Sequence, residues 1–242
     1  MTEDRFYFRQ LLAGRDFARD DPVAQQMVNF VYAIGDRETG DAVVVDPAYA
    51  PAELVEVLGA DGMRITGALV THYHPDHVGG NLGGWRIDGA AELLALPGVE
   101  AKLHVNADEA WGVKRVTGCD DGDLVLHASG DTIDVGAITV TTIHTPGHTP
   151  GSQCFFVDGR LVSGDTLFLD GCGRTDLPGG DPEALYESLT QKLAVVPDDA
   201  VLYPGHMYSP APAAPMGEVR TSNYVFRPRT REQWLAMFGH DG

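Results

Sequence analysis

Histidine and aspartate residues follow directly after several short apolar runs of this chain. The run at residues 65–70 is followed by THYHPDH, and later runs are each followed by one histidine or aspartate in a glycine-containing turn. Side chains at such strand ends face out of the sheet, and glycine lets the backbone approach a bound ion closely. The pattern therefore predicts a fold whose strand ends build a metal site.

The THYHPDH segment contains four of the candidate metal ligands. His72 and His74 lie two residues apart, so on an extended strand end they point to the same side. The turn at Pro75 can then bring Asp76 and His77 round to a second position nearby. Three imidazoles and a carboxylate packed together without a cation would be poorly compensated. The spacing therefore predicts a site that can hold two ions.

Three further motifs place one candidate ligand each. TPGHTPG contains His148, SGDTLF contains Asp165, and PGH contains His206. Each motif taken alone is more typical of an ordinary turn than of a metal ligand. All three follow apolar runs, as THYHPDH does, and together with that segment they indicate a single metal centre.

Apolar runs and helical patterns alternate along the chain. We predict strands from β-branched and aromatic content, and helices from apolar periodicity with Asp, Asn or Pro near the start. The order of elements predicts a layered α/β fold and leaves open a sandwich of two sheets or one doubly wound sheet. The predicted strands are 27–34, 42–45, 65–70, 138–143, 153–157, 160–162 and 200–203, and the predicted helices are 51–58, 90–96, 106–113, 182–195 and 230–238.

The charge balance argues against one class of partner. Asp and Glu number 35 against 17 Lys and Arg, for a net charge of −18. A surface this acidic repels a phosphate backbone, so we expect no nucleic-acid partner. Apolar stretches fall far short of the roughly 20 residues of a membrane-spanning helix, and the N-terminal segment lacks the apolar core of a signal peptide. We therefore expect a cytoplasmic protein with no membrane association, and its oligomeric state stays open.

The four motifs, in this order, resemble those of the metallo-β-lactamase fold superfamily of metallohydrolases. The resemblance covers residues 27–206. It implies an αβ/βα sandwich of four layers with the metal site at one edge of the two sheets. We expect residues 1–242 to form a single domain of this fold, with a short C-terminal helical tail over about residues 207–242.

The resemblance also assigns seven ligands to two divalent metal ions. Neutral imidazole and carboxylate oxygen suit zinc, with iron or manganese as alternatives. A water shared by two such ions loses a proton near neutral pH, so the expected nucleophile is a hydroxide that bridges the metals and is oriented by Asp76. The expected ligands are His72, His74 and His148 for one ion, Asp76, His77 and His206 for the other, and Asp165 as the bridge.

The sequence GCGRTD at residues 171–176 indicates a branch of the superfamily. It resembles a loop shared by hydroxyacylglutathione hydrolases (glyoxalase II) and persulfide dioxygenases. In the glyoxalase II pattern Arg174 stands where a cationic side chain binds the glutathione carboxylate, and its guanidinium suits bidentate binding. Tyr208 fits a thiol-binding tyrosine of that family. We therefore expect hydrolysis of small acyl thioesters, such as hydroxyacyl conjugates of glutathione or of another small thiol.

A second function is open from the sequence. The Arg-Thr-Asp run is closer to the persulfide dioxygenases, and His72, His148 and Asp165 form the 2-His-1-carboxylate set of non-haem iron oxygenases. The alternative is a mononuclear iron persulfide dioxygenase acting on glutathione persulfide or a similar thiol. A β-lactamase fits less well, because Asp165 stands where metallo-β-lactamases usually have cysteine. Residues 81–100 are predicted to form a lid or pocket wall.

Overall fold

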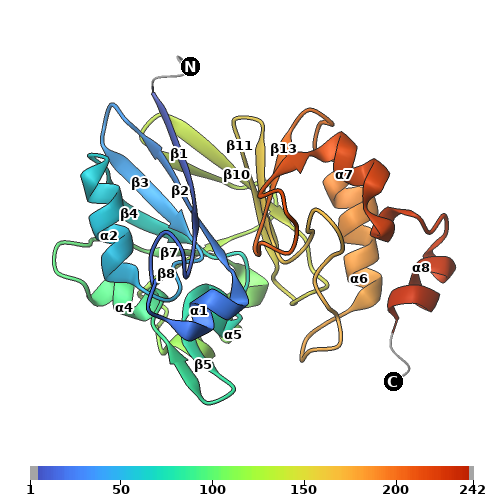
Figure 1. The fold of residues 1–242 in the computed structure, drawn as a ribbon, viewed down its shortest axis with the longest axis horizontal. Helices are drawn as coiled ribbons and strands as arrows, with labels where there is room; N and C mark the ends of the chain where they lie inside the picture. The colour runs from blue at the N-terminus through green and yellow to red at the C-terminus, as the bar shows by residue number, and fades with distance from the viewer. Residues whose placement is uncertain (1–4, 240–242) are drawn as a thin grey trace.

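Two six-stranded sheets form the centre of the molecule (Figure 1). The structure, a computed structural model, describes residues 5–239. The first sheet has the order β1-β2-β3-β4-β7-β8, in which β1 to β3 pair antiparallel and β3 to β8 pair parallel. Its strands are β1 (Phe6–Leu12), β2 (Phe30–Asp36), β3 (Asp41–Val45), β4 (Arg64–Leu69), β7 (Leu103–Asn106) and β8 (Leu124–His127).

The second sheet is built from the later part of the chain. Its order is β14-β13-β12-β11-β10-β9, and β12 and β13 form its parallel pair. The other neighbours pair antiparallel, as hairpin-connected strands do. Its strands are β9 (Thr132–Val135), β10 (Ile138–His144), β11 (Gln153–Val157), β12 (Arg160–Gly164), β13 (Val201–Pro204) and β14 (Ala214–Pro215).

The two sheets pack face to face through an apolar interior. Alternate residues of β2, namely Phe30, Tyr32 and Ile34, point into it because side chains alternate between the faces of a strand. The second sheet contributes residues such as Val140 and Phe155. Every residue of β2 is buried, since the other sheet covers one face and helices cover the other.

Helices cover the outer face of each sheet (Figure 1). Leu54 of α2 and Leu93 of α4 belong to the core behind the first sheet. Leu185 of α6, Met216 of α7 and Trp234 of α8 belong to the core behind the second. The layers therefore run helix, sheet, sheet, helix, which confirms the predicted αβ/βα sandwich. The helices are α1 (Pro22–Met27), α2 (Pro51–Ala60), α3 (Pro75–Val78), α4 (Ala90–Ala95), α5 (Ala110–Thr117), α6 (Pro182–Glu187), α7 (Met216–Ser222) and α8 (Arg231–Phe238), with the single turns η1 (Ala107–Glu109), η2 (Ser188–Lys192), η3 (Leu193–Val195) and η4 (Tyr224–Phe226).

The structure differs from the predicted ranges at element ends and in elements that were not predicted, and the predicted helix 182–195 is divided into α6, η2 and η3. β2 begins at Phe30 instead of residue 27, because the residues before it form α1. Asp21 caps that helix, which ends where Val28 takes a left-handed conformation (φ 50°). Strands β1, β7, β8, β9 and β14, the short strands at residues 80–82 and 85–87, and helices α1 and α3 were not predicted. β8 and β9 are edge strands of four residues each, too short for a clear period.

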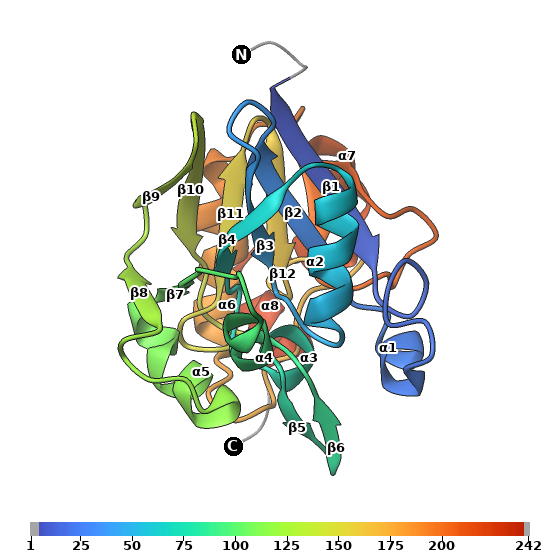
Figure 2. The ribbon, with the colours of Figure 1, turned by 90° about the vertical axis from the view of Figure 1, so that its left-hand side faces the viewer.

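Residues 81–100 form a small hairpin followed by α4. The hairpin of β5 (Gly80–Leu82) and β6 (Trp85–Ile87) projects from the body and is drawn in green at the lower end of Figure 2. Leu82 of this hairpin lines the cavity described below. No helix within residues 5–239 has the length and apolar character needed to cross a bilayer. The single-domain assignment of residues 1–242 stays a prediction.

Candidate metal centre

Backbone hydrogen bonds join the two sheets at one edge of the sandwich. The amide of Gln153 donates to the carbonyl of Thr71 (2.9 Å), and the amide of Phe30 donates to the carbonyl of Gly205 (2.8 Å). These bonds hold β2 and the end of β4 against the ends of β11 and β13. Candidate ligands that are distant in the sequence therefore meet at this edge.

The chain turns sharply after β4 because a proline begins the one-turn helix α3 (Pro75–Val78). His74 precedes this helix with an extended backbone (φ −63°, ψ 142°), as residues before proline commonly have. His72 and His74 thus lie on the extended approach to the helix, whereas Asp76 and His77 lie within it. The turn separates the four side chains into two positions, as the spacing predicts.

His72, His74 and His148 form the first cluster, with one ring nitrogen from each within 4.8 Å of the others. His74 Nδ1 and His148 Nε2 lie 3.0 Å apart. On the outer side, His148 Nδ1 donates to the carbonyl of Arg174 (2.7 Å) and His72 Nδ1 donates to the hydroxyl of Thr71 (2.9 Å). We assign these tautomers from the hydrogen-bond partners. They leave Nε2 of His72 and His148 free to face the cluster.

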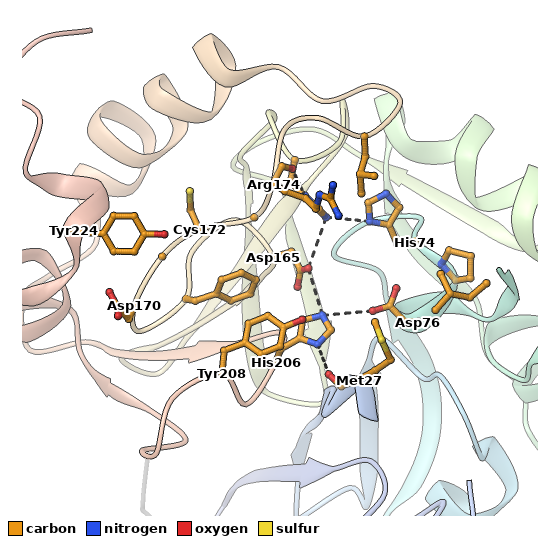
Figure 3. Close-up of a pocket in the computed structure, with 17 residues that line it drawn as sticks. Met27, His74, Asp76, Asp165, Asp170, Cys172, Arg174, His206, Tyr208 and Tyr224 are labelled. Carbon is orange, nitrogen blue, oxygen red and sulfur yellow. Dashed lines mark hydrogen bonds and ion pairs between the residues drawn. The ribbon is translucent and has the colours of Figure 1, made fainter. Parts of the chain in front are cut away.

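Asp76, His77 and His206 form the second cluster. The Nε2 atoms of His77 and His206 lie 3.2 Å apart, and each is 3.5 Å from Asp76 Oδ2. Figure 3 shows the contact between His206 and Asp76. His77 Nδ1 donates to Asp46 Oδ2 (2.9 Å), and His206 Nδ1 donates to the carbonyl of Met27 (2.8 Å). In the neutral rings both Nε2 lone pairs therefore point at the same space, which favours a cation there.

Asp165 lies between the two clusters. Its Oδ2 is 3.7 Å from His148 Nε2 and 3.4 Å from His206 Nε2. Its Oδ1 is 3.4 Å from His77 Nε2. In Figure 3 its carboxylate points toward His206. This carboxylate therefore occupies the position that a bridging ligand requires.

Two buried polar atoms of the centre have no hydrogen-bond partner among the described residues. They are His72 Nε2 and Asp165 Oδ1. Leaving such an atom unpaired costs about 1–3 kcal/mol, and a bound cation would satisfy both. Imidazole nitrogen together with carboxylate oxygen suits zinc, iron or manganese. The side chains present thus fit divalent metal ions.

The two clusters differ in their electrostatic environment. Burial, together with the neighbouring imidazoles, holds the pKa of His72 well below its usual value and lowers the pKa of His74 to about 4. Burial also acts on His77, but the carboxylates of Asp76 and Asp165 outweigh it and raise its pKa to about 10. The first cluster therefore offers neutral ligands, whereas the second attracts positive charge.

The sequence that carries these clusters matches a known family. A family model described as the metallo-beta-lactamase superfamily matches residues 26–206. The chain belongs to this superfamily. All seven candidate ligands lie within the matched residues.

Similar proteins within the superfamily are named for two different enzyme activities. The chain is 33% identical over 202 residues to the human "Persulfide dioxygenase ETHE1, mitochondrial". The aligned region covers 80% of this chain and 70% of the relative. It is 38% identical over 184 residues to a hydroxyacylglutathione hydrolase of Polaromonas sp., which covers 74% of this chain and 62% of the relative. The crystal structure of ETHE1 from Myxococcus xanthus superimposes with a TM-score of 0.78 at 25% identity, covering 96% of this chain and 89% of that one. The chain thus spans less than two thirds of the hydroxyacylglutathione hydrolase.

A cavity of about 580 Å³ adjoins the two clusters. Its floor includes His74 and His206, and its walls include the apolar side chains of Met27, Leu82 and Phe168. Mostly apolar cavities of this size with a few convergent polar groups are typical of small-molecule sites in proteins. This superfamily member therefore has space for a small substrate directly beside its candidate ligands.

Arg174 and Tyr208 lie at the rim of this cavity (Figure 3). The exposed guanidinium of Arg174 makes two hydrogen bonds to Asp176, at 2.6 and 2.5 Å. Its backbone carbonyl is the acceptor for His148. The ring of Tyr208 stacks on His206, with centroids 4.7 Å apart and planes at 6°. The structure thus places both predicted substrate-binding residues beside the cavity.

Two supporting residues were missed from the sequence. Asp46 accepts hydrogen bonds from the amide (2.8 Å) and hydroxyl (2.6 Å) of Thr71, in addition to that from His77. It directly follows the buried strand β3, the same signal that marked the other candidates, so that signal could have identified it. Asn29 donates from Nδ2 to Asp76 Oδ2 (3.1 Å), and no local pattern marks it.

Proposed function

We propose that the protein hydrolyses small acyl thioesters with two divalent metal ions, zinc being the first expectation and iron or manganese the alternatives. The observation that supports this proposal is that both clusters are complete and oriented by outer hydrogen bonds. When bound, such ions lower the pKa of water toward neutrality and polarise a carbonyl oxygen. The similarity to a hydroxyacylglutathione hydrolase points to the same reaction class.

Asp76 is the proposed catalytic residue. Asn29 fixes Asp76 Oδ2, which leaves Oδ1 to accept a hydrogen bond from the attacking water and orient it toward the carbonyl carbon. Burial alone would raise the pKa of Asp76, but His77 and His206 lower it. The carboxylate is therefore ionised at neutral pH and able to act as an acceptor.

The rim is proposed to bind the substrate. Arg174 can exchange its paired hydrogen bonds from Asp176 to a substrate carboxylate, because a guanidinium binds any carboxylate in the same bidentate geometry. The hydroxyl of Tyr208 can donate to the leaving thiolate. A thiol has a pKa of about 8.5, so little acid assistance is needed for its departure.

A mononuclear iron persulfide dioxygenase is the second candidate. In the sequence comparison, the human persulfide dioxygenase is matched over 70% of its length and the hydroxyacylglutathione hydrolase over 62%. His72, His148 and Asp165 supply two imidazoles and one carboxylate, the set used by non-haem iron oxygenases. In this alternative, one iron is held by these three residues and the substrate is glutathione persulfide or a similar thiol derivative.

Metal content and substrate turnover distinguish the two candidates. Protein purified without added metal is analysed by mass spectrometry for the equivalents of each element per chain. It is then assayed for thiol release from lactoyl thioesters and for oxygen uptake with glutathione persulfide. Close to two equivalents of metal with thiol release supports the hydrolase. Close to one equivalent of iron with oxygen uptake and no thioester turnover at millimolar substrate overturns it in favour of the dioxygenase.

A further inference from the structure

Glu109 is a buried carboxylate that the proposed reaction does not use. It is the last residue of η1, and its relative exposure is 0%. Burial raises its pKa to about 7, although hydrogen bonds from three donors act in the opposite direction. Burying such a group is costly unless its hydrogen bonds are satisfied, so the positions of its donors show what it does.

The three donors belong to two separate segments of the chain. Glu109 Oε1 accepts from the amide of Tyr73 (2.7 Å) and from the hydroxyl of Thr149 (2.7 Å). Glu109 Oε2 accepts from the amide of Gly151 (2.7 Å). Both carboxylate oxygens are therefore occupied, and a single side chain connects the segment after β4 to the loop between β10 and β11.

Each of these segments carries candidate ligands of the first cluster. Tyr73 is the residue between His72 and His74, so its amide belongs to the peptide that links them. Thr149 directly follows His148. The carboxylate thus holds the backbone on both sides of the first cluster through hydrogen bonds to Tyr73, Thr149 and Gly151.

The hydrogen bonds around Thr149 give its hydroxyl a defined direction. The amide of Thr149 donates to the hydroxyl of Ser152 (3.0 Å), and the two hydroxyls lie 2.7 Å apart. Because the Thr149 hydroxyl donates its hydrogen to Glu109, the Ser152 hydroxyl must donate to Thr149. The loop that carries His148 therefore has its hydrogen bonds directed onto Glu109.

The loop also approaches Glu109 too closely for a side chain. A Cβ on Gly151 would lie 2.4 Å from the backbone nitrogen of Glu109. Glycine at this position lets the loop come close enough for its amide to reach the carboxylate. The close approach is a separate observation, and it brings the loop between β10 and β11 directly against the backbone of Glu109.

We propose that Glu109 is a positioning residue for metal binding at the first cluster. Its hydrogen bonds hold His72 and His74 at the distance from His148 that a bound ion requires. The second cluster depends on other groups: Asp46, the Met27 carbonyl and Asn29. Loss of the Glu109 carboxylate therefore weakens metal binding at the first cluster selectively. The inference rests on the proposed function only in requiring that two metal ions bind. It does not depend on which reaction the protein catalyses.

The test compares the Co²⁺ affinities of the variants Glu109→Gln and Asp108→Asn. The affinities are measured by competition with a chelator, and each binding step is followed through the visible spectrum of the bound Co²⁺. Gln keeps the size of Glu but presents an amide N–H to one of the three donors. Asp108 is the exposed neighbour of Glu109, so its substitution removes the same charge from the same turn. His74→Ala and His206→Ala assign the two steps to the first and second cluster.

We expect Glu109→Gln to weaken the first-cluster step by about 10–100-fold, as outer-sphere substitutions at metal sites do, and the second step by less than about threefold. Asp108→Asn should leave both steps unchanged. The proposal is overturned if Glu109→Gln binds Co²⁺ at the first cluster with wild-type affinity, or if the substitution weakens both steps equally. Two Co²⁺ steps without thioester turnover in any variant contradict the proposed function alone.

A second pair of variants covers the case in which Glu109→Gln does not fold. Thr149→Val removes the hydroxyl that donates to Glu109 and keeps the shape of the side chain, whereas Thr149→Ser keeps the hydroxyl. We expect Val to weaken the first step by about tenfold and Ser to restore it to within about twofold. Equal affinities of the two variants overturn the proposal.

Discussion

The floor and the rim of the cavity are built in different ways. On the floor, His148 and His206 are 3% and 2% exposed, and their outer nitrogens are hydrogen-bonded to backbone carbonyls. On the rim, the side chain of Arg174 is 63% exposed and Tyr208 is 57% exposed. The floor is therefore fixed by the fold, whereas the side chains of the rim are fixed mainly by their immediate neighbours.

Under the proposed function, this difference assigns metal binding to the floor and substrate choice to the rim. Residues whose position depends on buried partners keep the same geometry with any substrate. Exposed side chains can rearrange around different ligands at little cost, since surface ion pairs contribute about 0–1 kcal/mol. Relatives named as hydrolases and as dioxygenases can thus share the floor and differ at the rim.

The largest expected effect is that of Asp165→Asn on the floor. Asn keeps the size of Asp but loses the charge that faces both clusters, so we expect activity to fall at least about a hundredfold and metal content to fall by about half or more. Metal analysis and steady-state assays measure both changes. Asp121→Asn, which alters an exposed carboxylate far from the cavity, should change neither. Full metal content in Asp165→Asn would show that this carboxylate does not bridge.

Removal of metal should destabilise the floor, and by the same amount in the rim variants as in the wild type, because these variants keep the metal ligands. Without a cation the carboxylates and ring lone pairs of the two clusters lose their common partner. We expect chelation to lower the melting temperature by roughly 5–10 °C, the effect of a ligand at about a hundredfold over its Kd. Differential scanning fluorimetry with chelator, and after return of metal, gives the shift. A melting temperature insensitive to chelator would contradict the proposed occupancy.

Arg174→Ala should act on substrate binding only. Its carbonyl, which accepts from His148, is retained in the variant, so metal content should not change. Loss of the guanidinium should raise KM by about tenfold for a substrate with a carboxylate, with kcat within about twofold. Arg174→Lys should give an intermediate KM because lysine keeps the charge without the bidentate geometry. A fall in metal content would place Arg174 with the floor instead of the rim.

Tyr208→Phe should have the smallest effect. Phe keeps the ring that stacks on His206 and removes only the hydroxyl. A single hydrogen bond of this kind contributes about 0.5–1.5 kcal/mol, so we expect kcat/KM to fall by about threefold. Tyr208→Ala removes the stacking ring as well and should lower kcat/KM further. Equal values for Phe and wild type would leave the hydroxyl without a role in turnover.

The floor was largely predictable from the sequence, because its residues follow apolar runs in recognisable motifs. All seven candidate ligands meet at one edge, and the predicted sandwich is the observed one. The supporting residues were harder to find. Asp46 directly follows an apolar run, as the candidate ligands do. Asn29 lies 47 residues from Asp76 in the sequence and Glu109 lies 36 residues from Tyr73, so no local pattern reveals these contacts.

The least predictable parts of the fold were its edges and its first strands. β1 and β8 lie at the two edges of the first sheet, where the apolar alternation is weakest and pairing depends on a partner distant in the sequence. The start of β2 depends on where α1 ends. Central strands such as β3 and β11, which are mostly buried, match their predicted ranges to within one residue.

The division of the candidate ligands between the two sheets also bears on how the protein is made. The last strand of the first sheet ends at residue 127. Once the chain has been synthesised to this point, it contains two members of each cluster but not yet the third. His148 and then His206 leave the ribosome later, since synthesis runs from the N-terminus. In the proposed two-metal site, neither ion could therefore be fully coordinated by a nascent chain until the second sheet has folded against the first, which would make metal capture a late step of biosynthesis.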